Sequence, residues 1–480
     1  MFDVVVIGCG ITGAAVVYEL SKYDLSVAVL EKENDISCAT TKANSGIVHA
    51  GYDPSPGTLM AKLNIEGAAL TETLCADLDV PYNKCGALVL AFSDEDKITL
   101  ERLYQRGIEN GVTGMEIIPG DEVRRIEPNI SDEAAAALLV PSAGIVSPWE
   151  FALALTETAA VNGVNIFLNY EVTDIKKTEN GYLISSGGQT IEAKMIVNAA
   201  GLYADTIHNM AAPPAFKIIP DRGEYFLLDK SECNRVSRVI FQCPSEKGKG
   251  TLVAPTAHGN LIVGPNNEPP LRKDDTSTTR EGLAEVVKSA KKSVPSIVFR
   301  DTIRNFSGVR AASDIDDFII APSMGAPGFI DAAGIKSPGL TAAPAVAKMV
   351  AGLLEKEGLK LFKKENFKST RKKVCFEKLS PSEKEKLVSE NASYGRVICR
   401  CETVTEGEIL DALKTNLPPV SVDGVKRRTS AGMGRCQGGF CGPKIVDILA
   451  KHYGVTPDKI MQDTSGTHIL TGITKAPEVH

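Results

Sequence analysis

Long hydrophobic runs are missing from this sequence. No segment approaches the 18 consecutive apolar residues that a membrane-spanning helix requires. The first residues contain no basic region followed by a long apolar stretch, and no small-residue cleavage signal follows them. Basic residues are not in excess either: 53 Lys and Arg stand against 60 Asp and Glu, which gives no support to nucleic-acid binding. These absences predict a cytoplasmic protein, and docking to a membrane-bound partner stays open.

Histidine and tryptophan are scarce, with six and one residues among 480. A chain of this length exceeds what one hydrophobic core serves, so two or three domains are expected. Cysteine is more frequent, with eleven residues, four of them crowded near the end. We interpret the other seven as reduced core residues of a cytosolic protein. These seven are Cys9, Cys38, Cys75, Cys85, Cys233, Cys243 and Cys375.

A nucleotide-binding motif opens the chain. The valine-rich run Phe2 to Ile7 predicts a buried parallel strand, and Gly8-Cys9-Gly10-Ile11-Thr12-Gly13 leads from it into a helix. A second strand ends at Glu31, whose carboxylate can accept hydrogen bonds from ribose hydroxyls. The glycines allow a tight turn, approach of a pyrophosphate and close packing of helix on strand. The order and spacing predict a dinucleotide site, but they do not separate FAD from NAD.

Later segments add small-residue stretches suited to an extended cofactor. Residues 38–51 are polar and small, and a strand at Met195–Val197 leads into Asn198-Ala199-Ala200-Gly201. Another strand and glycine turn begin at Phe329 and lead into a helix from about Ala343 to Leu354. The N-terminus of this helix can stabilise negative charge on a reduced flavin.

Together these segments resemble the D-amino-acid oxidase superfamily of FAD enzymes. The resemblance implies an α/β fold in which a Rossmann-like FAD-binding domain is interleaved with a mixed-sheet, α+β substrate domain. It places the FAD half at about 1–80, 146–210 and 326–355, and the substrate half at about 81–145 and 211–325. It assigns FAD contacts to Gly8, Gly10, Gly13, Glu31, Thr40, Thr41, Asn44, Ser45, Val172, Ala200, Gly201, Gly334, Lys336, Ser337, Gly339, Leu340 and Thr341.

Within that superfamily, residues 43–51 (ANSGIVHAG) are similar to two branches. One comprises glycerol-3-phosphate oxidases and dehydrogenases, and the other L-2-hydroxyglutarate dehydrogenases. The continuation at 52–57, together with the segments 222–225, 247–250, 259–265 and 336–344, resembles the short glycerol-3-phosphate oxidases of mycoplasmas. This implies a small phosphorylated alcohol, glycerol 3-phosphate, as substrate. A 2-hydroxy-acid or amino-acid substrate on the same scaffold stays open.

His49 is the candidate catalytic base. Oxidation of a secondary alcohol requires removal of the hydroxyl proton, and a neutral histidine is well matched to this task near pH 7. Only His49 lies in the cofactor-lining stretch, whereas His208, His258 and His452 are interpreted as structural. The resemblance assigns Arg310, Lys249 and Ser337 to the substrate anion. A guanidinium binds a phosphate or a carboxylate equally well, so these residues do not decide between the substrates.

The region near the end of the chain changes character twice. Residues 356–395 are dense in lysine and glutamate and predict a solvated connector with some helix. Cys399-x-Cys401 and, after a gap of 34 residues, Cys436-x4-Cys441 follow it. Thr405 begins a capping-box pattern for a helix running to about Lys414, and Pro443 suits the first turn of another. Four thiols brought together by such turns can hold zinc or an iron–sulfur cluster, with disulfides as a third alternative.

The cysteine spacing, with the approach Arg428 to Gly434, resembles the [2Fe–2S] domain of bacterioferritin-associated ferredoxins. This implies a small helical [2Fe–2S] domain at 396–465, ligated by Cys399, Cys401, Cys436 and Cys441, and a tail at 466–480. The same domain is attached to the flavoprotein subunit of anaerobic glycerol-3-phosphate dehydrogenases. The resemblance therefore implies electron-acceptor subunits and, beyond them, a quinone or another carrier. An inactive flavin half with a regulatory or iron-delivery module is the contrasting hypothesis.

Overall fold

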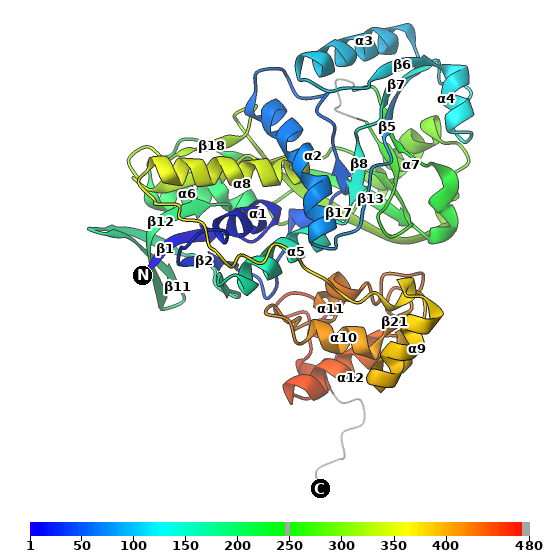
Figure 1. Ribbon diagram of the computed structural model, residues 1–480. Helices are drawn as coiled ribbons and strands as arrows, with labels where there is room; N and C mark the ends of the chain where they lie inside the picture. The colour runs from blue at the N-terminus through cyan, green and yellow to red at the C-terminus, as the bar shows by residue number, and fades with distance from the viewer. Residues whose placement is uncertain (245–249, 473–480) are drawn as a thin grey trace. The chain divides into compact units, whose positions relative to one another are not determined.

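The computed structural model describes residues 1–244 and 250–472, which form two compact units. Unit 1 comprises Met1–Lys32 and Ser37–Arg371. Unit 2 comprises Lys372–His480 together with the short segment Glu33–Ile36. Lys249, a predicted substrate-binding residue, lies outside the described residues. Figure 1 shows the two units.

The first sheet of unit 1 carries the predicted nucleotide fold. Its strands run in the order β10-β11-β12-β1-β2-β9, with β19 beside β12 and β18 beside β19. The pairs of β1 with β2 and β12, of β2 with β9, and of β12 with β19 are parallel, as expected for a Rossmann-like sheet. The strands are β1 (Phe2–Ile7), β2 (Val27–Leu30), β9 (Asn165–Phe167), β10 (Asp174–Thr178), β11 (Gly181–Ser186), β12 (Gln189–Asn198), β18 (Ile319–Pro322) and β19 (Phe329–Ala333).

Helices α1, α5 and α8 pack beside this sheet, with α1 in contact with both others. Helix α2 packs against α8 so closely that a Cβ at Gly67 would lie 2.1 Å from the Thr341 carbonyl oxygen. The helices of the unit are α1 (Ile11–Leu20), α2 (Leu59–Asp77), α3 (Asp94–Glu109), α4 (Gly120–Ile126), α5 (Pro148–Val161), α6 (Ala204–Ala211), α7 (Arg280–Ser293) and α8 (Gly339–Lys356).

The second sheet is mixed, as expected for the substrate half. Its order is β17-β13-β16-β15-β14-β5-β7-β6. Within this sheet, as far as the structure describes it, β14 and β5 pair in parallel and the other neighbouring strands pair antiparallel. In β5, Val89 faces a core that includes Leu100 and Leu103 of α3, whereas Leu88 and Leu90 face a core with α7. Both faces of the sheet are therefore covered. The strands are β5 (Ala87–Ala91), β6 (Glu116–Pro119), β7 (Ala136–Val140), β13 (Ile218–Leu228), β14 (Val239–Gln242), β15 (Leu252–Pro255), β16 (Leu261–Gly264) and β17 (Thr302–Ser313).

A small third sheet positions the segment before His49. Its order is β3-β8-β4, formed by Ile47–Val48, Gly144–Val146 and Tyr82–Asn83. Gly46 allows the approach, because its φ is +69° and a Cβ there would lie 2.5 Å from the Val146 carbonyl oxygen.

Unit 2 is a small helical domain. Thr405 closes the predicted capping box at the start of α10, and Pro443 lies in the first turn of α12. Its apolar core includes Ile409, Val425 and Ile445. The elements are α9 (Pro381–Glu390), β20 (Val397–Cys399), β21 (Val404–Thr405), α10 (Glu406–Ala412), α11 (Val422–Thr429) and α12 (Gly442–Tyr453). Among the described residues, no helix combines the length and the apolar character needed to cross a bilayer.

The seven scattered cysteines divide into two groups. Cys9, Cys75 and Cys243 are buried, as expected. The expectation is wrong for the other four, which are partly exposed because they lie in loops and short turns, where the chain runs at the surface. These four are Cys38, Cys85, Cys233 and Cys375.

Candidate functional site

The glycine loop after β1 has the shape of a dinucleotide cradle. A Cβ at Gly13 would lie 1.9 Å from the Gly8 carbonyl oxygen, so only glycine permits this packing of α1 on β1. Gly10 is the N-cap of α1 and supplies no side chain to cap the helix. Glu31 accepts the backbone N–H of Cys9 at 2.8 Å, which fixes the acid beside the loop. This combination of open helix terminus and adjacent carboxylate fits a dinucleotide such as FAD.

The predicted FAD-lining stretch is shaped by its own side chains. Thr41 Oγ1 accepts the Ile11 N–H at 2.9 Å, and Thr40 Oγ1 donates to the Val309 carbonyl at 2.6 Å. Asn44 donates to the Thr40 and Thr41 carbonyls and accepts the Gly46 N–H at 2.8 Å. These hydrogen bonds fix the backbone of the segment from Thr40 to Gly46, which leads directly into β3.

The remaining predicted FAD residues lie mostly at strand ends of the same sheet. Ala200 and Gly201 follow β12, and Gly334 follows β19, where its φ of +64° allows the turn. Lys336 pairs with Asp316 at 2.9 Å. Val172 is a buried member of the core that also contains Ile175 and Tyr182. Ser45, Gly339 and Leu340 lie in the loop before β3 and in the first turn of α8.

His49 is fixed from both sides of its backbone. Its N–H donates to Thr341 Oγ1 at 2.9 Å, and its carbonyl oxygen accepts the Asn64 side-chain amide at 2.9 Å. Thr341 also donates to the Ile47 carbonyl, so the first turn of α8 holds both ends of the segment. Phe241 stacks on the imidazole with ring centroids 5.9 Å apart.

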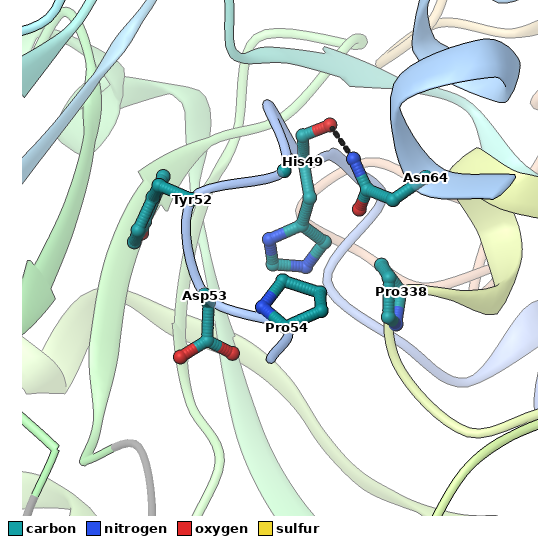
Figure 2. A pocket seen from close by; sticks show the side chains of 7 residues that line it. His49, Tyr52, Asp53, Pro54, Asn64 and Pro338 are labelled. Atoms are coloured by element: carbon teal, nitrogen blue, oxygen red, sulfur yellow. Dashed lines mark hydrogen bonds between the residues drawn. The ribbon is translucent and has the colours of Figure 1, made fainter. Parts of the chain in front are cut away.

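The imidazole reaches a second predicted residue. His49 Nε2 lies 3.2 Å from Ser337 Oγ, within hydrogen-bonding distance. Beside it lies a small pocket that is partly open to solvent. Figure 2 shows the His49 ring with Pro54 and Pro338 close to it, and the Asn64 amide against the His49 carbonyl. The pocket is lined by His49, Gly51, Tyr52, Asp53, Pro54, Asn64 and Pro338.

Arg310 has a carboxylate partner of its own. Its Nη1 lies 2.6 Å from Asp221 Oδ2 and 3.2 Å from Asn267 Oδ1. The Tyr225 hydroxyl also hydrogen-bonds the guanidinium; burial raises the pKa of Tyr225, and Arg310 opposes that rise. Gly223 makes room for the guanidinium, because a Cβ there would lie 2.5 Å from Nη2. The structure thus joins His49 to Ser337 and places Arg310 opposite Asp221.

His208 and His258 have structural surroundings. His208 is buried, with Nδ1 2.7 Å from Asp331 and Nε2 2.9 Å from the Pro213 carbonyl. His258 pairs with Glu150 at 2.7 Å and stacks on Trp149. Sequence reasoning missed Asn64 and Asp221 as members of the site; both act through long-range contacts that no local motif encodes.

In unit 2, the four crowded cysteines form two pairs. Cys401 Sγ lies 3.8 Å from Cys436 Sγ, and the Cys399 thiol hydrogen-bonds that of Cys441. Gly434 allows this approach, since a Cβ there would lie 2.2 Å from Cys401 Cβ. Among residues 1–244 and 250–472, no three His, Cys, Asp or Glu side chains have the geometry of a site for one metal ion. Two pairs of thiols fit a two-iron cluster with two cysteines per iron.

Hydrogen bonds favour the thiolate form, which metal binding requires, at Cys399 and Cys436. The Cys441 thiol donates to Cys399 and lowers the pKa of Cys399 to about 6, assisted by the Gly432 N–H and opposed by burial. The same bond raises the pKa of Cys441. N–H groups of Phe440, Gly438 and Gly439 lower the pKa of Cys436.

These features define an FAD dependent oxidoreductase with an iron–sulfur domain, and the chain belongs to that class. The family of FAD dependent oxidoreductases matches residues 3–353. The BFD-like [2Fe-2S] binding domain matches residues 397–451. Both cofactors expected from the sequence, FAD and a [2Fe–2S] cluster, are therefore confirmed, as is the fold.

Particular relatives narrow the class. The chain is 50% identical over 477 residues to a glycerol 3-phosphate dehydrogenase of Caloramator mitchellensis, covering 99% of each chain. It is 30% identical to the mitochondrial L-2-hydroxyglutarate dehydrogenase of Nematostella vectensis, covering 73% of this chain and 90% of that one. The chain is similar to the L-alpha-glycerophosphate oxidase of Mycoplasma pneumoniae with FAD bound, at a TM-score of 0.73 and 34% identity, covering 77% of this chain and 98% of that chain.

Proposed function

We propose that this protein oxidises glycerol 3-phosphate to dihydroxyacetone phosphate and passes the electrons to a partner protein. The contact between His49 and Ser337 beside the pocket carries the proposal. It places a proton acceptor and a hydroxyl together between the FAD-lining segment and the first turn of α8. Full-length similarity to a glycerol 3-phosphate dehydrogenase supports the substrate.

His49 acts as the general base. Its Nε2 takes the proton of the substrate hydroxyl, and Ser337 orients that hydroxyl by hydrogen bonding. Bound FAD supplies the acceptor, at flavin N5, for the hydride that leaves the substrate carbon. Thr341 and Asn64 hold the backbone of His49, and Phe241 stacks on its imidazole. The substrate then leaves as a ketone, and His49 returns its proton to solvent.

Arg310 binds the substrate phosphate. A guanidinium has five N–H donors, and three groups share the donors of Arg310: Asp221, Asn267 and Tyr225. Donors therefore remain for the phosphate oxygens, with Lys249 as a further cation. The adjacent Asp221 carboxylate competes with the phosphate for the Arg310 guanidinium.

The cofactor contacts predicted from the sequence belong to the same proposal. FAD is held by the glycine loop, Glu31, the stretch from Thr40 to Ser45 and the first turn of α8. The cluster is held by Cys399, Cys401, Cys436 and Cys441, and it supplies a one-electron carrier. The acceptor is a partner subunit that leads to a quinone or another carrier, and the protein works in the cytoplasm with membrane association through that partner.

Reduction of bound flavin by candidate substrates tests the proposal. The holoprotein is mixed anaerobically with glycerol 3-phosphate or L-2-hydroxyglutarate, with glycerol as the control that lacks an anion. We expect flavin absorbance to fall with glycerol 3-phosphate at least 100-fold faster than with either alternative. Faster reduction by L-2-hydroxyglutarate would show that the 2-hydroxy acid is the substrate in place of glycerol 3-phosphate. Sequence similarity supports this alternative less well, because the chain is 50% identical to a glycerol 3-phosphate dehydrogenase and 30% identical to an L-2-hydroxyglutarate dehydrogenase.

A further inference from the structure

The loop that joins β16 to α7, residues 265–279, carries a neighbour of Arg310. Asn267 Oδ1 accepts from Arg310 Nη1 at 3.2 Å, and Asp221 Oδ2 accepts from the same nitrogen at 2.6 Å. The strand that bears Arg310 is tied to the predicted FAD-lining stretch, because the carbonyl before Arg310 accepts the Thr40 hydroxyl at 2.6 Å. Asn267 therefore lies beside the cation proposed to bind the substrate anion, next to a cofactor-binding segment.

The neighbours of Asn267 in the chain are both fixed to β13. The side-chain oxygen of Asn266 accepts the Glu224 N–H at 2.7 Å. On the other side, Glu268 exchanges two backbone hydrogen bonds with Arg222, each at 2.9 Å. Because successive side chains of an extended segment point to opposite sides, Asn267 faces away from the Asn266 contact and toward the guanidinium.

Two buried charged residues of β13 anchor the rest of the loop. Arg222 Nη1 donates to Asp275 Oδ2 at 2.9 Å and to Ser277 Oγ at 3.0 Å. Glu224 accepts the backbone N–H and the hydroxyl of Thr279, each at 2.9 Å. Arg222 and Glu224 are 6% and 0% exposed. These contacts hold the loop against the strand, so the position of Asn267 is set by the fold.

The Asn267 amide can donate as well as accept. An amide that accepts with its oxygen carries two N–H donors on its nitrogen. The hydrogen bonds to Asp221 and Asn267 use the two N–H groups of Arg310 Nη1, so Nη2 and Nε remain for an anion, shared with the Tyr225 hydroxyl. Such a fork binds two oxygens of either a phosphate or a carboxylate. A phosphate monoester has a third terminal oxygen, which needs a donor outside the fork.

We propose that Asn267 binds the substrate phosphate and gives the site its preference for a phosphate over a carboxylate. The inference rests on the proposed function, because it takes Arg310 as the cation that binds the substrate. Arg310 holds two phosphate oxygens through its fork, and the Asn267 amide donates to the third. A carboxylate has only two oxygens, so the fork satisfies it without Asn267. This residue thus distinguishes glycerol 3-phosphate from a 2-hydroxy acid.

Asn267→Ala and Asn267→Asp test the proposal in the full-length holoprotein, by steady-state kinetics with a dye acceptor. Loss of the amide in Asn267→Ala should raise KM for glycerol 3-phosphate about 10-fold and leave kcat within twofold. Asn267→Asp keeps an oxygen for Arg310 but exchanges the N–H donors for a negative charge, so we expect KM to rise further, about 100-fold. Asn305→Asp, at an exposed position of β17, controls for the added charge and should leave KM within twofold.

The Asn267→Asp variant separates binding of substrate from orientation of Arg310. If Asn267 only oriented the guanidinium, a carboxylate would orient it at least as well, and KM within twofold of the parent value would overturn the proposal. Inhibition by L-2-hydroxyglutarate measures the preference for phosphate. Its inhibition constant should stay within twofold in Asn267→Ala, whereas a rise equal to that of KM would contradict the preference.

A further measurement distinguishes failure of this inference from failure of the proposed function. If glycerol 3-phosphate did not bleach the flavin of the parent protein, the proposed function would be wrong. Binding of inorganic phosphate to the parent and to Asn267→Asp, measured by isothermal titration calorimetry, then tests Asn267 by itself. We expect the dissociation constant to be at least 10-fold higher in the variant, and equal constants would overturn the inference.

Discussion

The imidazole Nε2 of His49 lies 3.2 Å from the hydroxyl oxygen of Ser337, although 288 residues separate them in the chain. The contact exists because Thr341, in the first turn of α8, accepts the backbone N–H of His49. Ser337 precedes the same helix. One helix terminus thus fixes both the candidate base and its neighbour.

Replacement of His49 tests the base directly. In His49→Ala, we expect the rate of flavin reduction to fall by about 10²- to 10⁴-fold, the range for loss of a positioned general base. FAD content should not change, because Glu31 and Thr41 hold the glycine loop through their own hydrogen bonds to the Cys9 and Ile11 N–H groups. Stopped-flow absorbance measures the rate, and His452→Ala, on exposed surface of α12, is the matched control. Retention of the full rate would remove His49 from this role.

Substitution of Arg310 should act on substrate binding. Loss of charge-assisted hydrogen bonds of about 1.5–3 kcal/mol in Arg310→Gln predicts a KM higher by roughly 10- to 100-fold. Asp221→Asn removes the competing carboxylate opposite Arg310 and is expected to lower KM several-fold. Steady-state kinetics with a dye acceptor distinguishes the two. If KM moved in the same direction in both variants, Arg310 would not be the phosphate ligand.

The cluster cysteines should be separable from flavin chemistry. In Cys401→Ser, one thiolate of the Cys401–Cys436 pair is lost, and we expect iron and sulfide content to fall to half or less. Flavin reduction by substrate should remain, while reduction of the natural acceptor is lost. Cys233→Ser, a partly exposed cysteine of unit 1, controls for removal of a thiol. A fully loaded cluster in Cys401→Ser would exclude Cys401 as a ligand.

The buried cysteines of unit 1 should resist alkylation in a pH-dependent way. Burial raises the pKa of Cys75 to about 12 and, with a contribution from Asp96, that of Cys243 to about 12. Because only the thiolate reacts, roughly 1 in 10⁴ of these groups is reactive at pH 8, and reactivity grows as pH rises toward 12. Mass spectrometry after iodoacetamide treatment should find both unlabelled in folded protein and labelled after unfolding. Fast labelling of Cys75 or Cys243 in the folded protein at pH 8 would contradict the prediction that both thiols are buried and have raised pKa values.

Local signals made much of the fold predictable. The Gly8–Gly13 turn, Glu31 and the capping box at Thr405 each depend on residues close in sequence, and the structure has all of them. The mixed second sheet followed from resemblance rather than from periodicity.

Pairings between distant residues were not predictable. Asp221 faces Arg310 because strands β13 and β17 pair in that register, which neither strand encodes alone. Asp35 meets Arg428 across 393 residues, and its charge gives no local sign of a partner. The four partly exposed cysteines were expected in the core because reduced thiols are usually buried. Their composition does not show that they lie in loops and short turns.

Anaerobic titration of the holoprotein with glycerol 3-phosphate tests the central claim most directly. Optical absorbance reports the flavin, and electron paramagnetic resonance reports the cluster. We predict that stoichiometric substrate bleaches the flavin and that the signal of a reduced [2Fe–2S] cluster follows, with dihydroxyacetone phosphate formed. Protein that contains both chromophores and yet shows neither change would contradict the account.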